Sequence, residues 1–420
     1  MRRAALLALV LLVCGWALTL WVTPWSNERV NDLFVYRTYA EPVLDGALPY
    51  RDVFSEYPPL ASPAIALPGV VGTGAETFRL AFAGWTLLLA ASLVLLCGVL
   101  AGRTGGSRGR AMVAAALMPL LCGALVRTHF DLAPVALTLA ALWLLSAARP
   151  RAGMAVLGLG AMTKFFPLLI APVALAWLVG RGSRKEAWQG AAALVAVLAV
   201  LGAAAVAASP DGALDALRYH LDRPVQIEST PALALLALDE AGVGHAVSIS
   251  SHRSDGLVHP ADGLASGALA AALVGVIAML ALFAAKRPDP RSLVLASLAA
   301  VAAFAVLGKV LSPQFMIWIL PLGALAFAWR MHALAATVAA AAVLTQLEFP
   351  ARYFDLVARE PLPLTLVALR NAALLAVVAL ATTALSGAAA RSRSRGPRRP
   401  PRPAPRSATG LRSRSRSALG

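Results

Sequence analysis

Charged residues are scarce in this chain of 420 amino acids. Only 14% of the residues are charged, whereas 59% are hydrophobic. A soluble domain is about half apolar, so this composition excludes a soluble globular protein. The apolar residues gather in runs close to the ~20 residues that cross a bilayer. The sequence therefore predicts an all-α protein with several membrane spans.

Cysteine is also rare, and Cys14, Cys97 and Cys122 all lie inside apolar runs. We therefore interpret them as buried small side chains rather than as a disulfide framework or a metal site. Elsewhere no spacing of potential ligands is diagnostic, so we expect no cofactor. Asp52 is open to two interpretations, an ion pair with Arg51 or a ligand of a divalent ion.

The apolar runs and their flanks predict about twelve transmembrane helices. The first run, "MRRAALLALVLLVCGW", resembles a signal peptide but lacks a small-residue cleavage site, so we expect an uncleaved span. The predicted spans lie near residues 4–25, 77–101, 111–126, 131–147, 152–164, 166–180, 187–208, 264–285, 292–309, 315–329, 331–347 and 362–386.

Acidic residues are few, and their positions indicate which way the protein faces. With a cytoplasmic N-terminus, the inner loops "GRTGGSRGR", "ARPR", "GRGSRKEA" and "KRPDPR" are all basic, as the positive-inside rule requires. Only Glu186 and Asp289 of the 21 acids then lie inside. We therefore expect both termini in the cytoplasm and large outer loops at residues 26–76 and 209–263.

Much of the net charge of +16 comes from ten arginines in residues 391–420, which contain no acid. Such an Arg/Ser/Pro-rich segment cannot bury a core, so we expect a disordered cytoplasmic tail after a membrane domain at residues 1–390. Attraction to anionic lipid headgroups is a simpler interpretation of this tail than binding to nucleic acid.

The first outer loop contains "NDLFVYRTYAEPVLDGALPYRDVFSEYPPL", which is dense in carboxylates and tyrosines. Leu33, Tyr36, Ala40 and Val43 have helical spacing, and Gly46 is a plausible stop, which predicts a helix over 32–45. Residues 60–72 form an apolar run too short to cross a membrane. Both segments suit helices that lie in the membrane interface.

This stretch resembles the bacterial polyprenol-phosphate-dependent mannosyltransferases of glycosyltransferase family 87. Further similarities follow in order, in "THFDLAPVALTLAALWLL", "AMTKFFPLLIAPVALAW", "HLDRPVQIES" and "GKVLSPQFMIWILP", so that the resemblance runs from about residue 20 to 330. It implies the C-type glycosyltransferase fold and an inverting transfer of a hexose, most often mannose, that depends on an acid in the first outer loop.

The resemblance also implies the partners. These are a polyprenyl-phosphate sugar donor, the lipid bilayer, and a glycolipid, polysaccharide or protein acceptor on the extracytoplasmic face of the plasma membrane. Related enzymes often carry histidines after the Ser-Pro of the last motif, where this chain has "SPQFMIW" with Gln314. Gln314 is thus a candidate acceptor contact that departs from the pattern.

An inverting transfer needs a carboxylate that accepts the acceptor's proton. Asp32, where the chain leaves the first span, is our candidate, and Glu56, held before two prolines, is the second. The alternative is that Asp32 caps the helix predicted over 32–45.

Cations must stabilise the departing phosphate. Lys164 and Lys309 lie at outer span ends, where they either bind phosphate or snorkel to the headgroups. Arg223 and Arg352 are weaker candidates, with ordinary ion pairs as the alternative. For sugar or acceptor contacts, the remaining candidates are His129, Asp131 and His220.

Two other functions fit a chain of this class, a transporter or flippase of lipid-linked sugars and an assembly scaffold without catalysis. A transporter would place ionisable residues in mid-span. Here the polar candidates gather at one membrane face, which favours surface chemistry.

Overall fold

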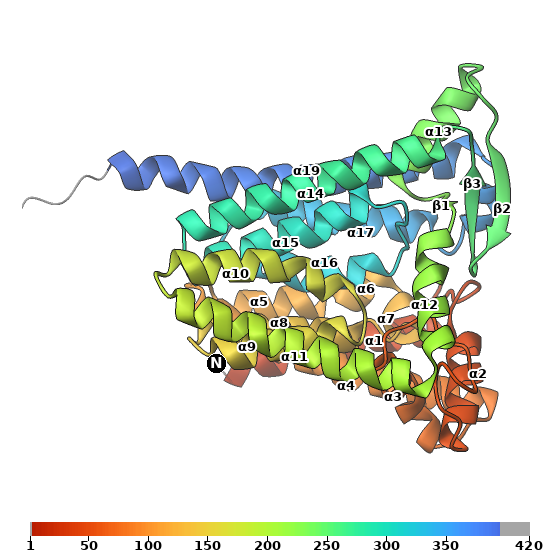
Figure 1. Ribbon diagram of the computed structural model, residues 1–420, viewed down its shortest axis with the longest axis horizontal. Coiled ribbons are helices and arrows are strands. Elements are labelled where there is room, and N and C mark those ends of the chain that lie inside the picture. The colour runs from red at the N-terminus through yellow and green to blue at the C-terminus, as the bar shows by residue number, and fades with distance from the viewer. Residues whose placement is uncertain (1, 395–420) are drawn as a thin grey trace, which may run out of the picture.

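Helices make up most of the computed structural model, which describes residues 2–394 (Figure 1). Within these residues six helices are long and apolar enough to cross a membrane. They are α1 (Arg2–Trp21), α4 (Ala75–Arg103), α11 (Arg184–Ala208), α14 (Asp262–Lys286), α15 (Pro290–Leu307) and α19 (Pro361–Ser394). The protein is therefore a membrane protein.

Shorter apolar helices fill the bundle between these six. They are α8 (Leu132–Ser146), α9 (Pro150–Ala161), α10 (Ala171–Gly180) with the preceding 3-10 turn η2 (Phe166–Ile170), α16 (Phe315–Ala328) and α17 (His332–Glu348). These helices agree in position with predicted spans, but several are shorter than a bilayer is thick. The number of twelve crossings therefore stays a prediction, as does the C-type fold.

Burial differs sharply among the long helices and separates the centre of the bundle from its lipid face. In α15, 78% of an apolar stretch of 18 residues is buried inside the protein, whereas in α11 and α14 only 11% of the corresponding stretch is buried. All three helices are apolar around their whole circumference. Because apolar side chains that do not pack against protein must face hydrocarbon, α11 and α14 form an outer, lipid-facing wall.

The interfacial elements cluster at one end of the bundle, opposite the start of α1 and the end of α19 (Figure 1). From the first outer loop come α2 (Leu33–Leu44), α3 (Ala61–Ala66) and η1 (Leu67–Val70). The second loop supplies α12 (Pro210–Asp222), β1 (Val225–Gln226), α13 (Thr230–Glu240), β2 (Val247–Ser251) and β3 (Ser254–Val258). A further short helix, α18 (Tyr353–Val357), precedes α19.

Helix α2 follows the predicted spacing closely. Leu33, Tyr36 and Ala40 are buried on one face, and the helix ends at Leu44. Gly46 then adopts a φ of 97°, a left-handed conformation that side-chain-bearing residues rarely adopt. The predicted helix and its stop are confirmed.

The prediction of an all-α protein needs correction in the second outer loop. There β1, β3 and β2 form a three-stranded antiparallel sheet in that order, with Val225 opposite Leu257 and Ser251 opposite Ser254. The strands are only two to five residues long, so their alternating pattern was too short to recognise in the sequence.

The predicted span at 111–126 is also interrupted. It divides into α5 (Arg108–Ala116), α6 (Met118–Cys122) and α7 (Leu125–Thr128). Pro119 lacks the N–H that a continuing helix would need, and Gly123 turns the chain with a φ of 55°. Two other boundaries differ, since the first span ends at Trp21 rather than at 25, and α19 continues to Ser394. From residue 395 onward the predicted tail lies outside the described residues.

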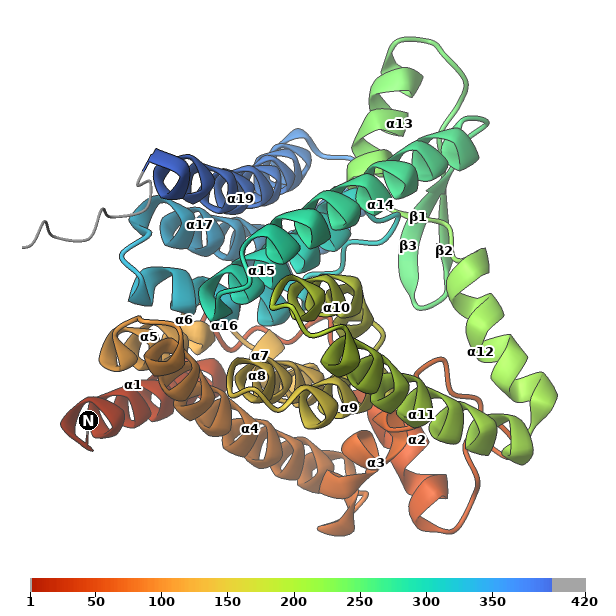
Figure 2. The ribbon, with the colours of Figure 1, turned by 60° about the vertical axis from the view of Figure 1, so that its left-hand side comes forward.

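Helix α12 crosses from the end of α11 to the sheet beside α14, as both ribbon views show (Figure 2). It is amphipathic: Leu214, Leu217 and Leu221 are exposed, whereas Ala216 is buried. The helix thus lies at the end of the bundle where the two large loops cluster, between the ends of α11 and α14.

Candidate active site

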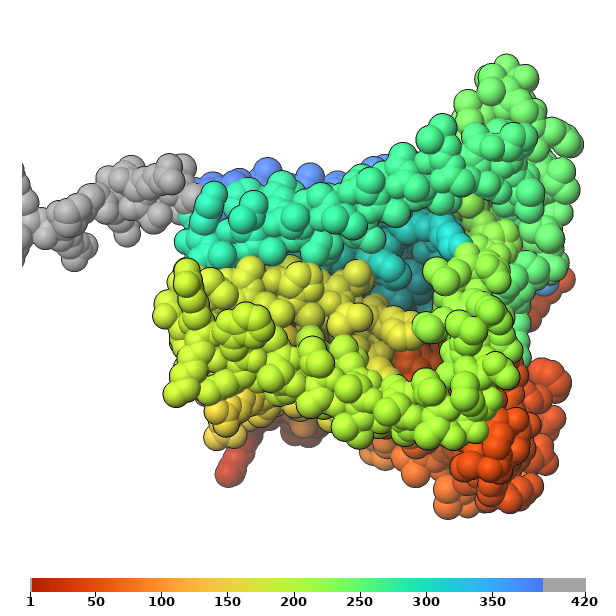
Figure 3. Space-filling view, in the orientation of Figure 1, coloured from red at the N-terminus to blue at the C-terminus, as the bar shows by residue number. Residues whose placement is uncertain are grey.

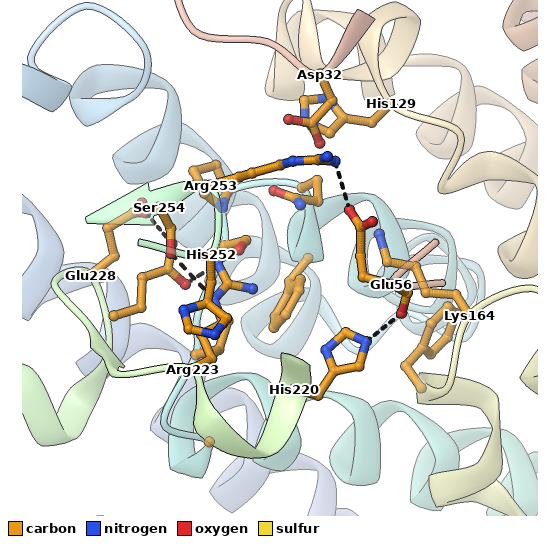
Figure 4. Close-up of a pocket in the computed structure, with 18 of the residues that line it drawn as sticks. Asp32, Glu56, His129, Lys164, His220, Arg223, Glu228, His252, Arg253 and Ser254 are labelled. Atoms are coloured by element: carbon orange, nitrogen blue, oxygen red, sulfur yellow. Dashed lines mark hydrogen bonds and ion pairs between the residues drawn. The ribbon is translucent and has the colours of Figure 1, made fainter. Parts of the chain in front are cut away.

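A cavity of about 460 Å³ lies at the end of the bundle where the two outer loops meet. In the space-filling view the surface is hollowed between α10, α12 and α14 (Figure 3). Eight of the ten residues selected from the sequence line this cavity: Asp32, Glu56, His129, Lys164, His220, Arg223, Lys309 and Gln314. Their side chains come from six separate segments of the chain, and Figure 4 labels six of them.

Asp32 precedes α2, but its carboxylate does not cap that helix. The cap bond is made instead by Asn31, whose Oδ1 accepts from the Leu33 N–H at 2.9 Å. Asp32 Oδ2 accepts from the Tyr36 hydroxyl at 3.1 Å and lies 3.4 Å from His129 Nε2. With 34% of its side chain exposed, Asp32 is available to a ligand in the cavity.

Glu56 is far more enclosed, with 5% of its side chain exposed. Its Oε1 accepts from Arg253 Nη1 at 3.0 Å, and its Oε2 accepts from the Tyr39 hydroxyl. Burial and the neighbouring Glu56 carboxylate raise the pKa of Tyr39, so this phenol remains a donor at neutral pH. Because both carboxylate oxygens are occupied, Glu56 is less suited than Asp32 to accept a proton from a substrate.

Lys164 lines the cavity while its ammonium group pairs with the fully buried Asp131. Nζ of Lys164 lies 2.7 Å from Asp131 Oδ1, which also accepts from Trp318 Nε1 at 2.5 Å. The Phe130 ring lies beneath the ammonium, with its centroid 4.9 Å from Nζ. Asp131 is thus placed behind the cavity wall rather than in it, where it sets the position of Lys164.

Two further cations, Lys309 and Arg223, line the cavity. Lys309, in the loop after α15, donates to the backbone oxygen of Leu221 at 2.6 Å. Burial lowers the pKa of Lys309 from its usual value. Arg223, at the end of α12, donates from Nε to Ser254 Oγ at 3.2 Å.

His220 and Gln314 complete the predicted set in the cavity. His220 Nε2 lies 2.7 Å from the backbone oxygen of Glu56, and burial lowers the pKa of the imidazole, which favours a neutral ring that donates this bond. Gln314 is the residue before α16 and makes no capping bond with its side chain. Its amide remains a candidate contact for a sugar hydroxyl.

Arg352 is not brought to the cavity. It precedes α18, and its Nη1 donates to the backbone oxygen of Leu347, which ties the end of α17 to the following turn. Arg352 and Asp131 are the two selected residues that the structure separates from the cavity lining.

Sequence reasoning missed two charged residues that line the cavity, Arg253 and Glu228. Arg253 lies at the tip of the β2–β3 hairpin. Glu228 is fully buried, and its backbone and side-chain oxygens accept from Arg370 on α19. Burial raises the pKa of Glu228, and Arg370 offsets this only in part. Their charged partners, Glu56 for Arg253 and Arg370 for Glu228, are more than a hundred residues away in the chain, so no local pattern pointed to them.

An aromatic wall borders the charged part of the cavity. Trp318 stacks on Phe166 with centroids 4.3 Å apart and on Phe315 at 3.9 Å. Phe304 lies beside this stack, 6.1 Å from Phe315. The cavity therefore has one apolar side, next to its cations and carboxylates.

The described part of the chain contains no group of three or more His, Cys, Asp or Glu residues arranged to hold a metal ion. Asp52 is exposed and forms an ion pair with Arg51 at 2.8 Å, as one of its two interpretations predicted.

Comparison with known proteins identifies a family. The model of glycosyltransferase family 87 matches residues 54–313, which is more than half of the chain. The matched segment is narrower than the resemblance we saw in the sequence, and Asp32 precedes it. No curated protein matches the chain.

Proposed function

Because this chain belongs to glycosyltransferase family 87, we propose that it transfers a hexose from a polyprenyl-phosphate carrier to an acceptor hydroxyl, with inversion at the sugar. We propose mannose as the sugar, in line with the mannosyltransferases that the sequence resembles. One observation carries the proposal: a single cavity is lined by Asp32 and His129 together with the cations Lys164, Lys309 and Arg223.

In the proposed reaction Asp32 accepts the proton of the acceptor hydroxyl. The freed oxygen forms a bond to the anomeric carbon of the sugar, on the face opposite the phosphate. The bond between that carbon and the phosphate oxygen breaks, and its electron pair stays on the phosphate. Inversion follows because the new bond forms on the side opposite the one that breaks.

The phosphate gains negative charge as it departs, so cations placed in advance around it lower the barrier. Lys309 and Arg223 are proposed to bind its oxygens. Lys164 is proposed to contribute from the other side, with Asp131 holding its ammonium in place. A lysine held by a single ion pair retains two further N–H donors for a ligand.

The carrier's isoprenoid chain needs an apolar route to this cavity. The hollow in Figure 3 opens between α10, α12 and α14, and α14 faces lipid over most of its surface. The stack of Phe166, Trp318 and Phe315 offers an apolar wall for the first isoprene units. This combination supports a lipid-linked donor over a water-soluble nucleotide sugar.

We further propose that the cavity faces the extracytoplasmic side of the plasma membrane. The basic loops and both chain ends would then lie in the cytoplasm, as the positive-inside rule favours. The start of α1 and the end of α19 lie at the same end of the bundle, away from the cavity (Figure 1), which fits this arrangement.

The proposal is tested with the purified full-length protein in liposomes. A polyprenyl-phosphate sugar labelled in the sugar is supplied, and labelled glycolipid or polysaccharide and free polyprenyl phosphate are measured together. Mannose is compared with glucose and arabinose donors. Mass spectrometry of envelope glycans after deletion and restoration of the gene then identifies the acceptor. Movement of intact donor across the bilayer without sugar transfer would instead identify a flippase.

A further inference from the structure

The β2–β3 hairpin turns through two residues, His252 and Arg253, which both have positive φ angles of 51° and 54°. Such a type I′ turn favours Asn-Gly, because most side chains are strained in this conformation. Histidine and arginine are therefore unfavourable residues for the turn itself. Their presence calls for a role outside the turn.

Both side chains of the turn face the cavity (Figure 4). The Arg253 guanidinium reaches Glu56, and it lies over the Tyr39 ring at 5.0 Å. His252 packs on Tyr219 of α12, with ring centroids 4.8 Å apart. The tip of the second outer loop is thus tied to both the first outer loop and α12.

The contacts of Arg253 use only one edge of its guanidinium. Within residues 2–394, Nη1 makes the hydrogen bonds to Tyr39 and Glu56, and Nε and Nη2 make none. The Arg253 side chain is 41% exposed, whereas Glu56 beneath it is almost fully buried. In this cavity-lining arginine the Nε–Nη2 edge is therefore left without a hydrogen bond in the described residues, while a buried carboxylate holds Nη1.

The Nε–Nη2 edge carries two parallel N–H groups, which match two oxygens of a phosphate group. Arg223 lies beside the same hairpin, since its Nε donates to Ser254 Oγ. Lys309 lines the same cavity. The cationic side of the cavity thus includes the hairpin tip as well as the residues selected from the sequence.

We propose that Arg253 binds the phosphate of the lipid carrier through its Nε–Nη2 edge, and that Glu56 is the residue that positions Arg253. The inference rests on the proposed function, because it assumes a polyprenyl-phosphate donor. It assigns Glu56 the role of counter-ion rather than base, and it explains why an arginine occupies a turn position that does not favour it.

Binding is measured on the full-length protein in nanodiscs, with a polyprenyl phosphate and the matching polyprenol as probes. Replacing Arg253 by Ala weakens binding of the phosphate by about 10-fold or more, since it removes a charge-assisted bond pair, and leaves polyprenol binding unchanged. Arg253→Lys retains the positive charge but lacks the two parallel N–H donors, so an intermediate loss of phosphate binding is expected. Arg218→Ala, on the exposed face of α12, is the matched control.

The role of Glu56 in positioning Arg253 is tested with Glu56→Gln. As a single substitution it should weaken phosphate binding, whereas added to Arg253→Ala it should cause little further loss. Equal losses for phosphate and polyprenol would assign Arg253 a structural role and overturn the inference. Unchanged phosphate binding in a folded Arg253→Ala protein would do the same.

Sugar transfer separates the two proposals. If the wild-type protein transfers sugar and Arg253→Ala leaves the KM for the donor unchanged, only the inference about Arg253 fails. If the wild-type protein neither binds the polyprenyl phosphate nor transfers sugar, the proposed function fails, and the inference fails with it.

Discussion

Asp32 Oδ2 and His129 Nε2 lie 3.4 Å apart and join the first outer loop to the turn before α8. The Thr128 hydroxyl donates to the backbone oxygen of Ala124 at 2.9 Å, so its oxygen is left to accept from His129 Nδ1 at 3.0 Å. The contact with Thr128 fixes the orientation of the imidazole, with Nε2 towards Asp32. The imidazole is thus placed to hold the Asp32 carboxylate in position in the cavity.

Asp32→Asn is expected to reduce the turnover number by roughly 10²–10⁴-fold, because the amide cannot accept the acceptor's proton. Binding of the polyprenyl-phosphate donor should persist. Steady-state transfer and donor binding are measured on the same preparations. Asp45→Asn, at an exposed position in the same loop, should behave as wild type. Full turnover in Asp32→Asn would remove Asp32 as the base.

His129→Gln tests whether the imidazole positions the Asp32 carboxylate. Without the ring the Asp32 carboxylate is held less firmly, so we expect the turnover number to fall by roughly 10-fold, with little change in the KM for the donor. A double-mutant cycle with Asp32→Asn measures the coupling. Strictly additive effects would show that the two residues act independently.

Lys309→Ala is expected to raise the KM for the donor about 10-fold, because the phosphate loses one charged contact. The control is Lys185→Ala, an exposed lysine at the far end of the bundle. Donor titrations with each variant give the comparison. An unchanged KM in Lys309→Ala would mean that this lysine serves only its bond to the Leu221 backbone oxygen.

Asp131→Asn leaves the Lys164 ammonium without its buried partner, which costs about 3–5 kcal/mol when one member of such a pair is removed. Thermal unfolding in detergent should show a clear loss of stability. The double variant Asp131→Asn with Lys164→Met should recover much of that stability but not donor binding. Recovery of both properties would contradict a phosphate contact by Lys164.

His220 should make stability depend on pH. Burial depresses its pKa below the usual 6.5, so the folded protein binds fewer protons than the unfolded chain between these values. This contribution is fully present above pH 6.5 and is lost as the pH falls from 6.5 towards the depressed pKa of the folded protein. Unfolding curves from pH 5 to 8 measure the effect. In His220→Gln, which retains an N–H donor for the Glu56 carbonyl, this pH dependence should be weaker.

Local patterns predicted a large part of this molecule. The helix that ends before Gly46 and the approximate positions of the long helices followed from apolar spacing. The gathering of Asp32, Glu56, Lys164 and Lys309 in one cavity followed from placing them at one membrane face. The sheet in the second outer loop was not predicted, because its strands are shorter than any recognisable pattern.

Composition and the lengths of apolar runs were sufficient to assign a membrane protein with its polar chemistry at one end, because transfer into a bilayer depends mainly on local hydrophobicity. Which charged side chains pair with one another was decided only by the packing of the helices and by the register of the β2–β3 hairpin. Asp131 lies behind the cavity wall, where it pairs with Lys164. Arg253 bonds to Glu56, although the two residues are nearly two hundred positions apart in the chain. Such pairs depend on which distant segments become neighbours, and that is settled by long-range packing.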